Sequence, residues 1–140
     1  MLCTLNSSSA NDGQLQYISK DYFDVLIVDE ASQAMEASMW IAIPNVSKLI
    51  MAGDINQLPP VIMSPQAIKG GLNISLMEKG IKNLGPNSFV SLKKQYRMNE
   101  KIMIWPSRKF YENTLEADES VKNHLLIDIP SVSKNSLTSL

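Results

Sequence analysis

Two adjacent carboxylates, Asp29 and Glu30, come directly after the apolar run Val25–Val28. Ligands of open α/β sheets bind at the carboxyl ends of the strands, so we expect these side chains at the mouth of a site. One carboxylate there can bind the Mg²⁺ of a nucleoside triphosphate, and the other can orient or deprotonate an attacking water. The alternative is a solvated strand end whose acid caps the next helix. The longer string Asp29-Glu30-Ala31-Ser32-Gln33 favours the functional interpretation.

A second polar string, Gly53-Asp54-Ile55-Asn56-Gln57-Leu58-Pro59-Pro60, follows another apolar run. Glycine permits close backbone approach at a strand end, so Asp54 and Gln57 are predicted to face the same mouth as Asp29. A neutral glutamine amide suits the sensing of a terminal phosphate or of the attacking water. The alternative is a rigid turn, stiffened by its two prolines, that binds no ligand.

The third string, Gln95-Tyr96-Arg97-Met98, also follows an apolar run. Arg97 could supply positive charge to a transferring phosphoryl group, and Tyr96 could stack on a base. Taken alone, the string is more typical of a solvated arginine beside a half-buried tyrosine.

The elements that must position these strings are predicted from the apolar pattern. Strands are expected at Val25–Val28, Lys48–Ala52 and Phe89–Leu92, the first two buried on both faces of a parallel sheet because their apolar runs are continuous. Helices are expected at Ala34–Ile41, at Ile74–Leu84 and within Asn99–Tyr111. Alternating strands and helices predict an α/β fold with a parallel sheet.

Several local expectations follow from the same pattern. Leu2–Leu5 resembles the tail of a further strand, as if the chain were cut inside a larger sheet. Trp40 and Trp105 are expected in the core. The methionines are also expected there, as side chains that fill gaps in the packing. Pro106 is expected to kink or end its helix. The turn-rich segment Leu84–Ser88 is the best candidate for a domain crossing.

Composition limits the classes of protein. The chain has 140 residues, 44% of them hydrophobic. Its net charge is −1, which gives no indication of nucleic-acid binding. One cysteine and one histidine exclude an internal disulfide and a Cys/His zinc cluster. No signal peptide and no apolar run of about 20 residues is present, so we expect no membrane partner and a cytoplasmic or nuclear, reducing compartment.

Together, in this order, the three strings resemble the helicase motifs of superfamily 1, in particular the branch that contains the nonsense-mediated-decay helicase. The strings beginning at Asp29, Gly53 and Gln95 resemble motifs II, III and IV of that family. Softer matches cover much of the remaining chain and only choose among members of the branch: Tyr22–Asp24, Ser75–Glu78 and Ser120–Leu126.

The resemblance implies a RecA-like P-loop NTPase fold, ATP and Mg²⁺ as ligands, and ATP-driven 5′–3′ movement along single-stranded RNA or DNA. In catalysis, Asp29 would bind Mg²⁺, Glu30 would activate water, Gln57 would sense the γ-phosphate and Arg97 would contact it. The remaining residues implied in binding ATP are Gln33, Asp54, Gln95 and Tyr96. Those implied in contacting nucleic acid are Asn6, Ser7, Ser8, Pro59 and Pro60. The family pattern assigns residues 1–88 to the end of a first RecA-like domain and residues 89–140 to the start of a second.

One departure from the family is large: the 140 residues contain no Gly-x-x-x-x-Gly-Lys-Ser/Thr string, the loop that cradles the phosphates. We therefore expect the chain alone to be inactive and to need the remainder of a helicase core as its partner. Two alternatives stay open. One is a non-catalytic nucleic-acid-binding or interaction module derived from a helicase. The other is a metal-dependent nuclease in which Asp29, Glu30 and Asp54 share a divalent ion.

Overall fold

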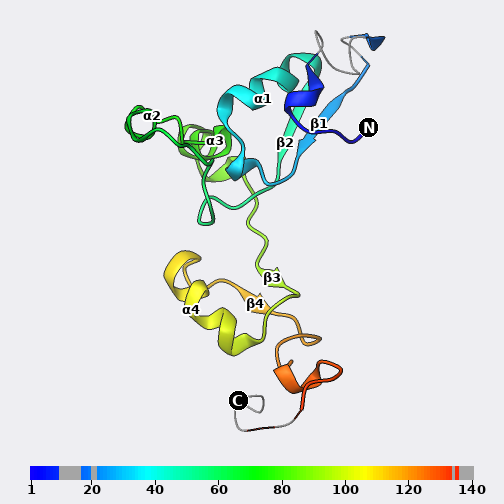
Figure 1. The fold of residues 1–140 in the computed structure, drawn as a ribbon, viewed down its shortest axis with the longest axis vertical. Helices are drawn as coiled ribbons and strands as arrows, with labels where there is room; N and C mark the ends of the chain where they lie inside the picture. Colours follow the sequence, from blue (N-terminus) through cyan, green and yellow to red (C-terminus); the bar gives the residue numbers. More distant parts are fainter. Residues whose placement is uncertain (10–16, 20–21, 134, 136–140) are drawn as a thin grey trace. The chain divides into compact units, whose positions relative to one another are not determined.

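The computed structural model describes residues 1–9, 17–19, 22–133 and 135 (Figure 1). The chain divides into two compact units, Met1–Phe89 and Val90–Leu140. Among the described residues, no helix combines the length and apolar character needed to cross a bilayer.

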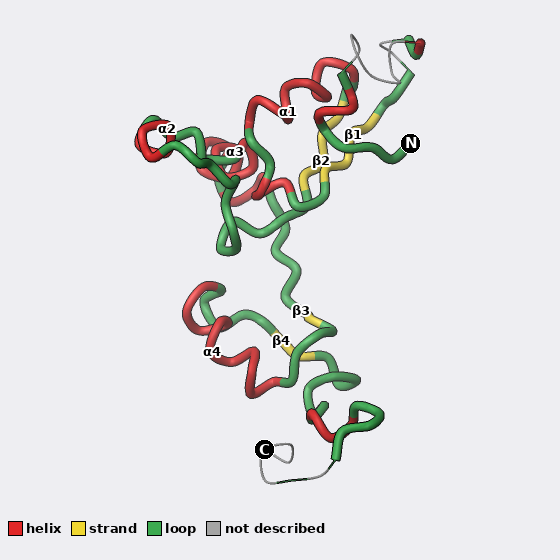
Figure 2. Tube along the Cα trace, in the orientation of Figure 1, coloured by secondary structure: helices red, strands yellow, loops and turns green. Residues whose placement is uncertain are grey.

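The first unit is built around a parallel pair of strands, β1 (Val25–Val28) and β2 (Lys48–Met51). Both strands form where the sequence predicts them, and the predicted helices form as α1 (Glu36–Ala42) and α3 (Leu76–Leu84). The described part of this unit also contains a shorter helix, α2 (Pro65–Lys69), and the 3-10 turns η1 (Asn6–Ser8), η3 (Ala31–Gln33), η4 (Ile43–Asn45) and η5 (Pro86–Ser88). Figure 2 shows these helices and strands along the chain.

The core of the first unit lies on one face of this strand pair. Val28, Ala31 and Met39 are its buried centre. Around them pack partly buried side chains from the strands, from α3 and from the 3-10 turns or the residues next to them: Leu5, Leu26, Ala34, Ile43, Leu49, Met51, Leu76 and Met77. Because side chains alternate along a strand, Leu26 and Val28 face this core together with their β2 partners.

The opposite face of the pair is open to solvent in the described part of the chain. Ile27 is 68% exposed, and Val25 and Ile50 on the same face are also exposed. The expectation that these strands are buried on both faces is therefore wrong, because the described helices pack on one face only.

Polar contacts set the ends of the helices in the first unit. The Ser75 hydroxyl is buried and accepts a hydrogen bond from the Glu78 N–H (3.1 Å), which caps the N-terminus of α3. Glu36 on α1 forms an ion pair with Lys79 on α3 (2.5 Å). This ion pair links α1 to α3, in addition to the packing of both helices against the core.

The second unit combines a short parallel strand pair, β3 (Lys94–Gln95) and β4 (Glu116–Ala117), with helix α4 (Glu100–Phe110) and the turn η6 (Leu126–Asp128). The predicted strand at Phe89–Leu92 is wrong: no strand forms there, and Val90 and Leu92 are more than 80% exposed. Pairing begins only at Lys94, because β4 offers a partner of just two residues.

Helix α4 corrects two further expectations. It continues four residues past Pro106, so the proline does not end it. Its buried residues are Met103 and Ser107, which are four apart and share one face. Trp105 lies between them on the opposite face and is 67% exposed, so it is not a core residue.

Two expectations for the first unit are wrong: the burial of Trp40 and a strand at Leu2–Leu5. Trp40 is 52% exposed, because α1 buries Met39 and Ala42, and its indole N–H donates to Glu36 (3.3 Å) at the surface. Leu2–Leu5 forms no strand, and Leu2 is almost fully exposed.

The methionines differ in burial, so the expectation that they fill gaps in the core holds for some of them only. Met39 and Met103 are buried, whereas Met63 is 92% exposed.

Candidate active site

The loop after β1 presents both candidate carboxylates to solvent. Asp29 and Glu30 are exposed, and the Glu30 N–H donates to Asp29 Oδ1 (3.0 Å). Glu30 adopts a left-handed backbone conformation (φ 52°), which is unusual for a residue with a Cβ and costs free energy. Gln33 makes two hydrogen bonds to Glu30. The Gln33 side-chain amide donates to Glu30 Oε2 (3.1 Å), and the Gln33 backbone N–H donates to the Glu30 carbonyl (2.9 Å). The loop therefore orients one carboxylate oxygen of Glu30 and leaves Oε1 with no hydrogen bond to Gln33.

The loop after β2 is bonded directly to the loop after β1. The Ala31 N–H donates to the Ala52 carbonyl (2.8 Å), and the Asp54 N–H donates to Ser32 Oγ (3.3 Å). Gly53 lies at the closest approach, where an added Cβ would be 3.0 Å from the backbone nitrogens of Ala31 and Ser32. The two loops thus form one continuous edge at the carboxyl ends of β1 and β2.

Asp54 organises its own loop. Its Oδ1 accepts from the Asn56 N–H (3.0 Å), and its Oδ2 accepts from the Gln57 side-chain amide (2.9 Å). Gln57 is exposed. The Asp54 carboxylate therefore orients Gln57 and does not point freely toward a nucleotide.

The residues implied in contacting nucleic acid lie in different environments. Asn6 and Ser7 are exposed on η1, but Ser8 is 4% exposed and its hydroxyl donates to the Leu5 carbonyl (2.6 Å). Pro59 is exposed, whereas Pro60 is buried. Ser8 and Pro60 are thus placed to support their loops, and the other three are accessible to a ligand.

In the second unit, the candidate residues form a loop between β3 and α4. Tyr96 is 66% exposed and Arg97 is exposed, while Gln95 and Met98 are half-buried. These four residues line an open hollow of about 400 Å³.

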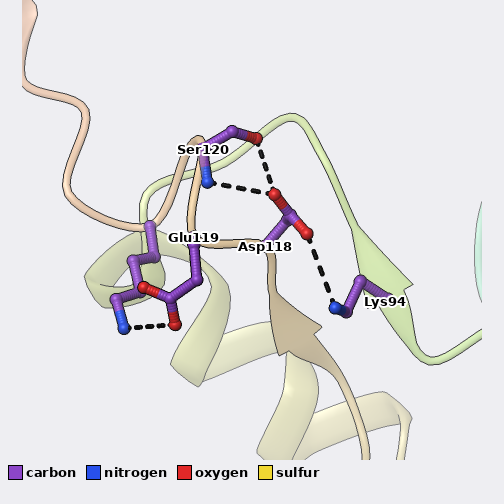
Figure 3. A network of polar contacts seen from close by, with 5 residues as sticks. Lys94, Asp118, Glu119 and Ser120 are labelled. Atoms are coloured by element: carbon purple, nitrogen blue, oxygen red, sulfur yellow. Dashed lines mark hydrogen bonds and ion pairs between the residues drawn. The ribbon is translucent and has the colours of Figure 1, made fainter.

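An ionic network fastens the strand pair behind this loop (Figure 3). Asp118, just after β4, accepts from the Ser120 N–H (3.0 Å) and hydroxyl (2.7 Å), and it pairs with Lys94 on β3 (3.5 Å). The Asp118 N–H donates to the Gln95 carbonyl (3.0 Å). The hydrogen bonds from Ser120, assisted by Lys94, hold the pKa of Asp118 below its ordinary value of 3.8.

This lowered pKa predicts an acid dependence of stability. An acid whose pKa is lower in the folded state stabilises the fold above its ordinary pKa, and that contribution disappears as the pH falls through the folded value. We expect the unfolding midpoint of the chain to decrease below about pH 4. Asp118→Asn should make this decrease smaller, whereas Asp24→Asn, at an exposed aspartate, should leave it unchanged. Denaturant unfolding between pH 2 and pH 7 measures both; identical profiles for Asp118→Asn and the unmodified chain would contradict the assignment.

Two residues to which the sequence analysis gives no role, Ser32 within the first string and Asn99, matter for this geometry. Ser32 is buried and joins the two loops of the first unit, and no local sequence signal distinguishes it. Asn99 caps α4 by accepting from the Lys101 N–H (2.8 Å), and it donates to the His124 carbonyl (2.8 Å). An asparagine directly before a helix is a capping signal that the sequence does carry.

Among residues 1–9, 17–19, 22–133 and 135, no three Asp, Glu, His or Cys side chains gather as a metal site. The nuclease alternative, in which Asp29, Glu30 and Asp54 share one ion, therefore gains no support.

Comparison with known proteins gives the class and then the family. One AAA domain profile matches residues 1–65 and a second AAA domain profile matches residues 72–138. With the parallel strands and their loops, these matches define a RecA-like α/β fold of the P-loop NTPase class. The chain belongs to the superfamily 1 helicases, as its three strings predict.

Named relatives support the same family. The chain is 43% identical over 135 residues to DNA-binding protein SMUBP-2 of Rattus norvegicus. This match covers 96% of this chain and 14% of the relative. SMUBP-2 is the immunoglobulin mu-binding protein 2, to which Tyr22–Asp24, Ser75–Glu78 and Ser120–Leu126 are similar. The chain is 51% identical over 107 residues to an ATP-dependent helicase of Methanocaldococcus jannaschii (76% and 16%). It is 36% identical over 138 residues to DNA polymerase alpha-associated DNA helicase A of Schizosaccharomyces pombe (99% and 19%). The chain thus spans less than a fifth of the length of these relatives.

Proposed function

We propose that this chain supplies the metal-binding, water-activating and phosphate-sensing part of an ATP-dependent helicase that moves 5′ to 3′ on single-stranded RNA or DNA. Residues 1–88 would be the end of its first RecA-like domain and residues 89–140 the start of its second. The remainder of the helicase core is the required partner, and the compartment is the cytoplasm, the nucleus or both.

The observation that carries this proposal is the bonding between the loops after β1 and β2. The Asp54 N–H to Ser32 Oγ bond and the Ala31 N–H to Ala52 carbonyl bond keep the two loops in contact. The acidic pair of one loop and the Gln57 amide of the other therefore belong to one edge of the sheet. An NTPase needs this juxtaposition, because metal, water and γ-phosphate must be bound within a few ångströms of one another.

The donor groups suit Mg²⁺·ATP. Magnesium is commonly held by one or two carboxylates together with substrate phosphates, and Asp29 is an exposed carboxylate at a strand end. When bound, Mg²⁺ neutralises charge on the phosphates. Glu30 would accept the proton of the attacking water through Oε1 while Gln33 holds its other oxygen. Gln57, oriented by Asp54, would donate to the γ-phosphate or the water.

The second unit would contribute charge and stacking. Arg97 would stabilise charge on the transferring γ-phosphoryl group, and Tyr96 would stack on the nucleotide base in the hollow that both line. Contacts to the nucleic-acid backbone would come from Asn6, Ser7 and Pro59, which are accessible. Such contacts position a strand without reading its sequence.

A chimera tests this function directly. In the helicase chimera, this chain replaces the matching 138-residue segment of the Schizosaccharomyces pombe helicase. We expect the chimera to hydrolyse ATP in the presence of single-stranded nucleic acid and to unwind a duplex that carries a 5′ single-stranded tail. Calorimetric titration of the chain alone with Mg²⁺·ATP should give a Kd above about 1 mM.

The outcomes separate the two candidate functions. The second candidate function is a non-catalytic nucleic-acid-binding or interaction module derived from a helicase. A folded chimera that binds single-stranded nucleic acid but hydrolyses no ATP would favour that module. Tight, Mg²⁺-dependent binding of ATP by the chain alone would contradict the proposal that the remainder of the core is required.

A further inference from the structure

Gln95 lies at the centre of the loop that carries Tyr96 and Arg97. Its carbonyl Oε1 accepts from the Arg97 N–H (2.8 Å) and from the Met98 N–H (2.7 Å). Its amide Nε2 donates to the Met98 carbonyl (2.7 Å) and lies 3.6 Å from Met103 Sδ. The two backbone N–H groups require the oxygen on one side and the Met98 carbonyl requires the nitrogen on the other, so only one orientation of the amide satisfies all three groups.

These contacts use the full capacity of the side chain. A glutamine amide has two N–H donors and one carbonyl oxygen with two lone pairs. Both lone pairs of Gln95 are directed at the loop backbone, and its donors are directed at Met98 and Met103. The Gln95 side chain is therefore engaged by the loop itself.

The ends of the loop are fastened independently of this amide. The Gln95 backbone pairs with Ala117 in the β3–β4 ladder and accepts from the Asp118 N–H. At the other end, Asn99 caps α4, and Met103, which is 4% exposed, anchors the helix beside the Gln95 amide. Between these anchors, the Gln95 amide holds the backbone N–H of Arg97 and both the N–H and the carbonyl of Met98.

We propose that Gln95 is a positioning residue: its side-chain amide binds the loop backbone at Arg97 and Met98 and thereby fixes where the exposed Tyr96 and Arg97 side chains stand at the hollow that they line. This inference deepens the proposed function and rests on it for the role of Arg97. Loss of the amide frees the N–H groups of Arg97 and Met98 and lets the arginine sample other positions. A displacement of about 1 Å in such a group can lower the rate on the order of 10²-fold.

The first experiment measures the loop itself in the full 140-residue chain. In Gln95→Ala, we expect hydrogen exchange at the Arg97 and Met98 amides to become at least about tenfold faster, since each loses its acceptor. Gln95→Glu keeps an oxygen for both N–H groups but loses the donor to the Met98 carbonyl, so its exchange should be faster than in the unmodified chain and slower than in Gln95→Ala. Gln66→Ala, at an exposed glutamine of α2, is the matched control and should leave both rates unchanged. Unchanged exchange in Gln95→Ala would overturn the proposal.

The second experiment is a double-mutant cycle in the helicase chimera. Arg97→Ala should lower kcat on the order of 10³-fold, and Gln95→Ala on the order of 10²-fold. In the Arg97→Ala background, Gln95→Ala should lower kcat by less than about twofold, because its effect passes through the arginine. Equal losses from Gln95→Ala in both backgrounds would overturn the proposal. An unchanged kcat for Arg97→Ala would instead contradict the proposed function, and the exchange rates would still decide whether Gln95 holds the loop.

Discussion

Replacing Glu30 with glutamine in the helicase chimera should lower ATP turnover by about 10²–10⁴-fold, the usual contribution of a general base. The substitution keeps the length of the side chain, and its amide oxygen can still accept from Gln33. It removes only the ability to take a proton. Because Asp29 stays in place as the metal ligand, we expect nucleotide affinity to change by less than about threefold.

Single-turnover hydrolysis and titration with a fluorescent nucleotide measure the two effects separately. Glu112→Gln is the matched control: Glu112 is an exposed glutamate with nearly the same left-handed backbone (φ 53°), but it lies outside the candidate site. It should leave both quantities unchanged. Turnover of Glu30→Gln within tenfold of the unmodified chimera would show that another group activates the water.

The secondary structure near the site follows from short-range patterns in the sequence. The apolar run Val25–Val28 forms β1, and the periodic segments form α3 and α4 within two residues of their expected bounds. Phe89–Leu92, with three apolar residues of four, also predicts a strand but forms none. A strand depends on a partner of matching length elsewhere in the chain, and β4 offers only two residues.

Burial was harder to predict than the elements themselves. Trp105 and Met103 are both apolar and two residues apart, so composition alone gives them the same expectation. On a helix they point in nearly opposite directions, and the face that packs is decided by contacts with the rest of the unit. The helix buries Met103 and Ser107 and leaves the larger Trp105 outside.

The candidate site shows the same division between local and long-range information. The order of strands and polar strings predicts that Asp29 and Gln57 follow two strands of one sheet, and β1 and β2 are indeed adjacent. The left-handed backbone of Glu30 and the bond from Asp54 to Ser32 are not encoded within either string. They depend on two loops, separated by more than 20 residues, meeting at close range.

That meeting point is Gly53, and its replacement by valine should have the largest effect on stability. A Cβ at Gly53 would lie 3.0 Å from the backbone nitrogens of Ala31 and Ser32 and 3.1 Å from Met77 Sδ. Backbone atoms cannot rotate away, and Ala31 is itself fully buried and bonded to the Ala52 carbonyl. Overpacking of this kind costs about 1–3 kcal/mol, so Gly53→Val should lower the free energy of unfolding by that amount. Gly53→Ala should lower it by less.

The control for this change is Gly80→Ala, within helix α3. A Cβ there meets nothing closer than Met51 Cε at 3.7 Å, and alanine is the better helix former, so this change should raise the free energy of unfolding by about 0.5–1 kcal/mol. Urea unfolding of the chain measures both variants. In the helicase chimera, Gly53→Val should also lower kcat on the order of 10²-fold, because it pushes the loop of Asp29 and Glu30 away from that of Gln57. An unfolding free energy within about 0.5 kcal/mol of the unmodified chain would show that the two loops can separate without cost, and the shared edge on which the site depends would then have no structural basis.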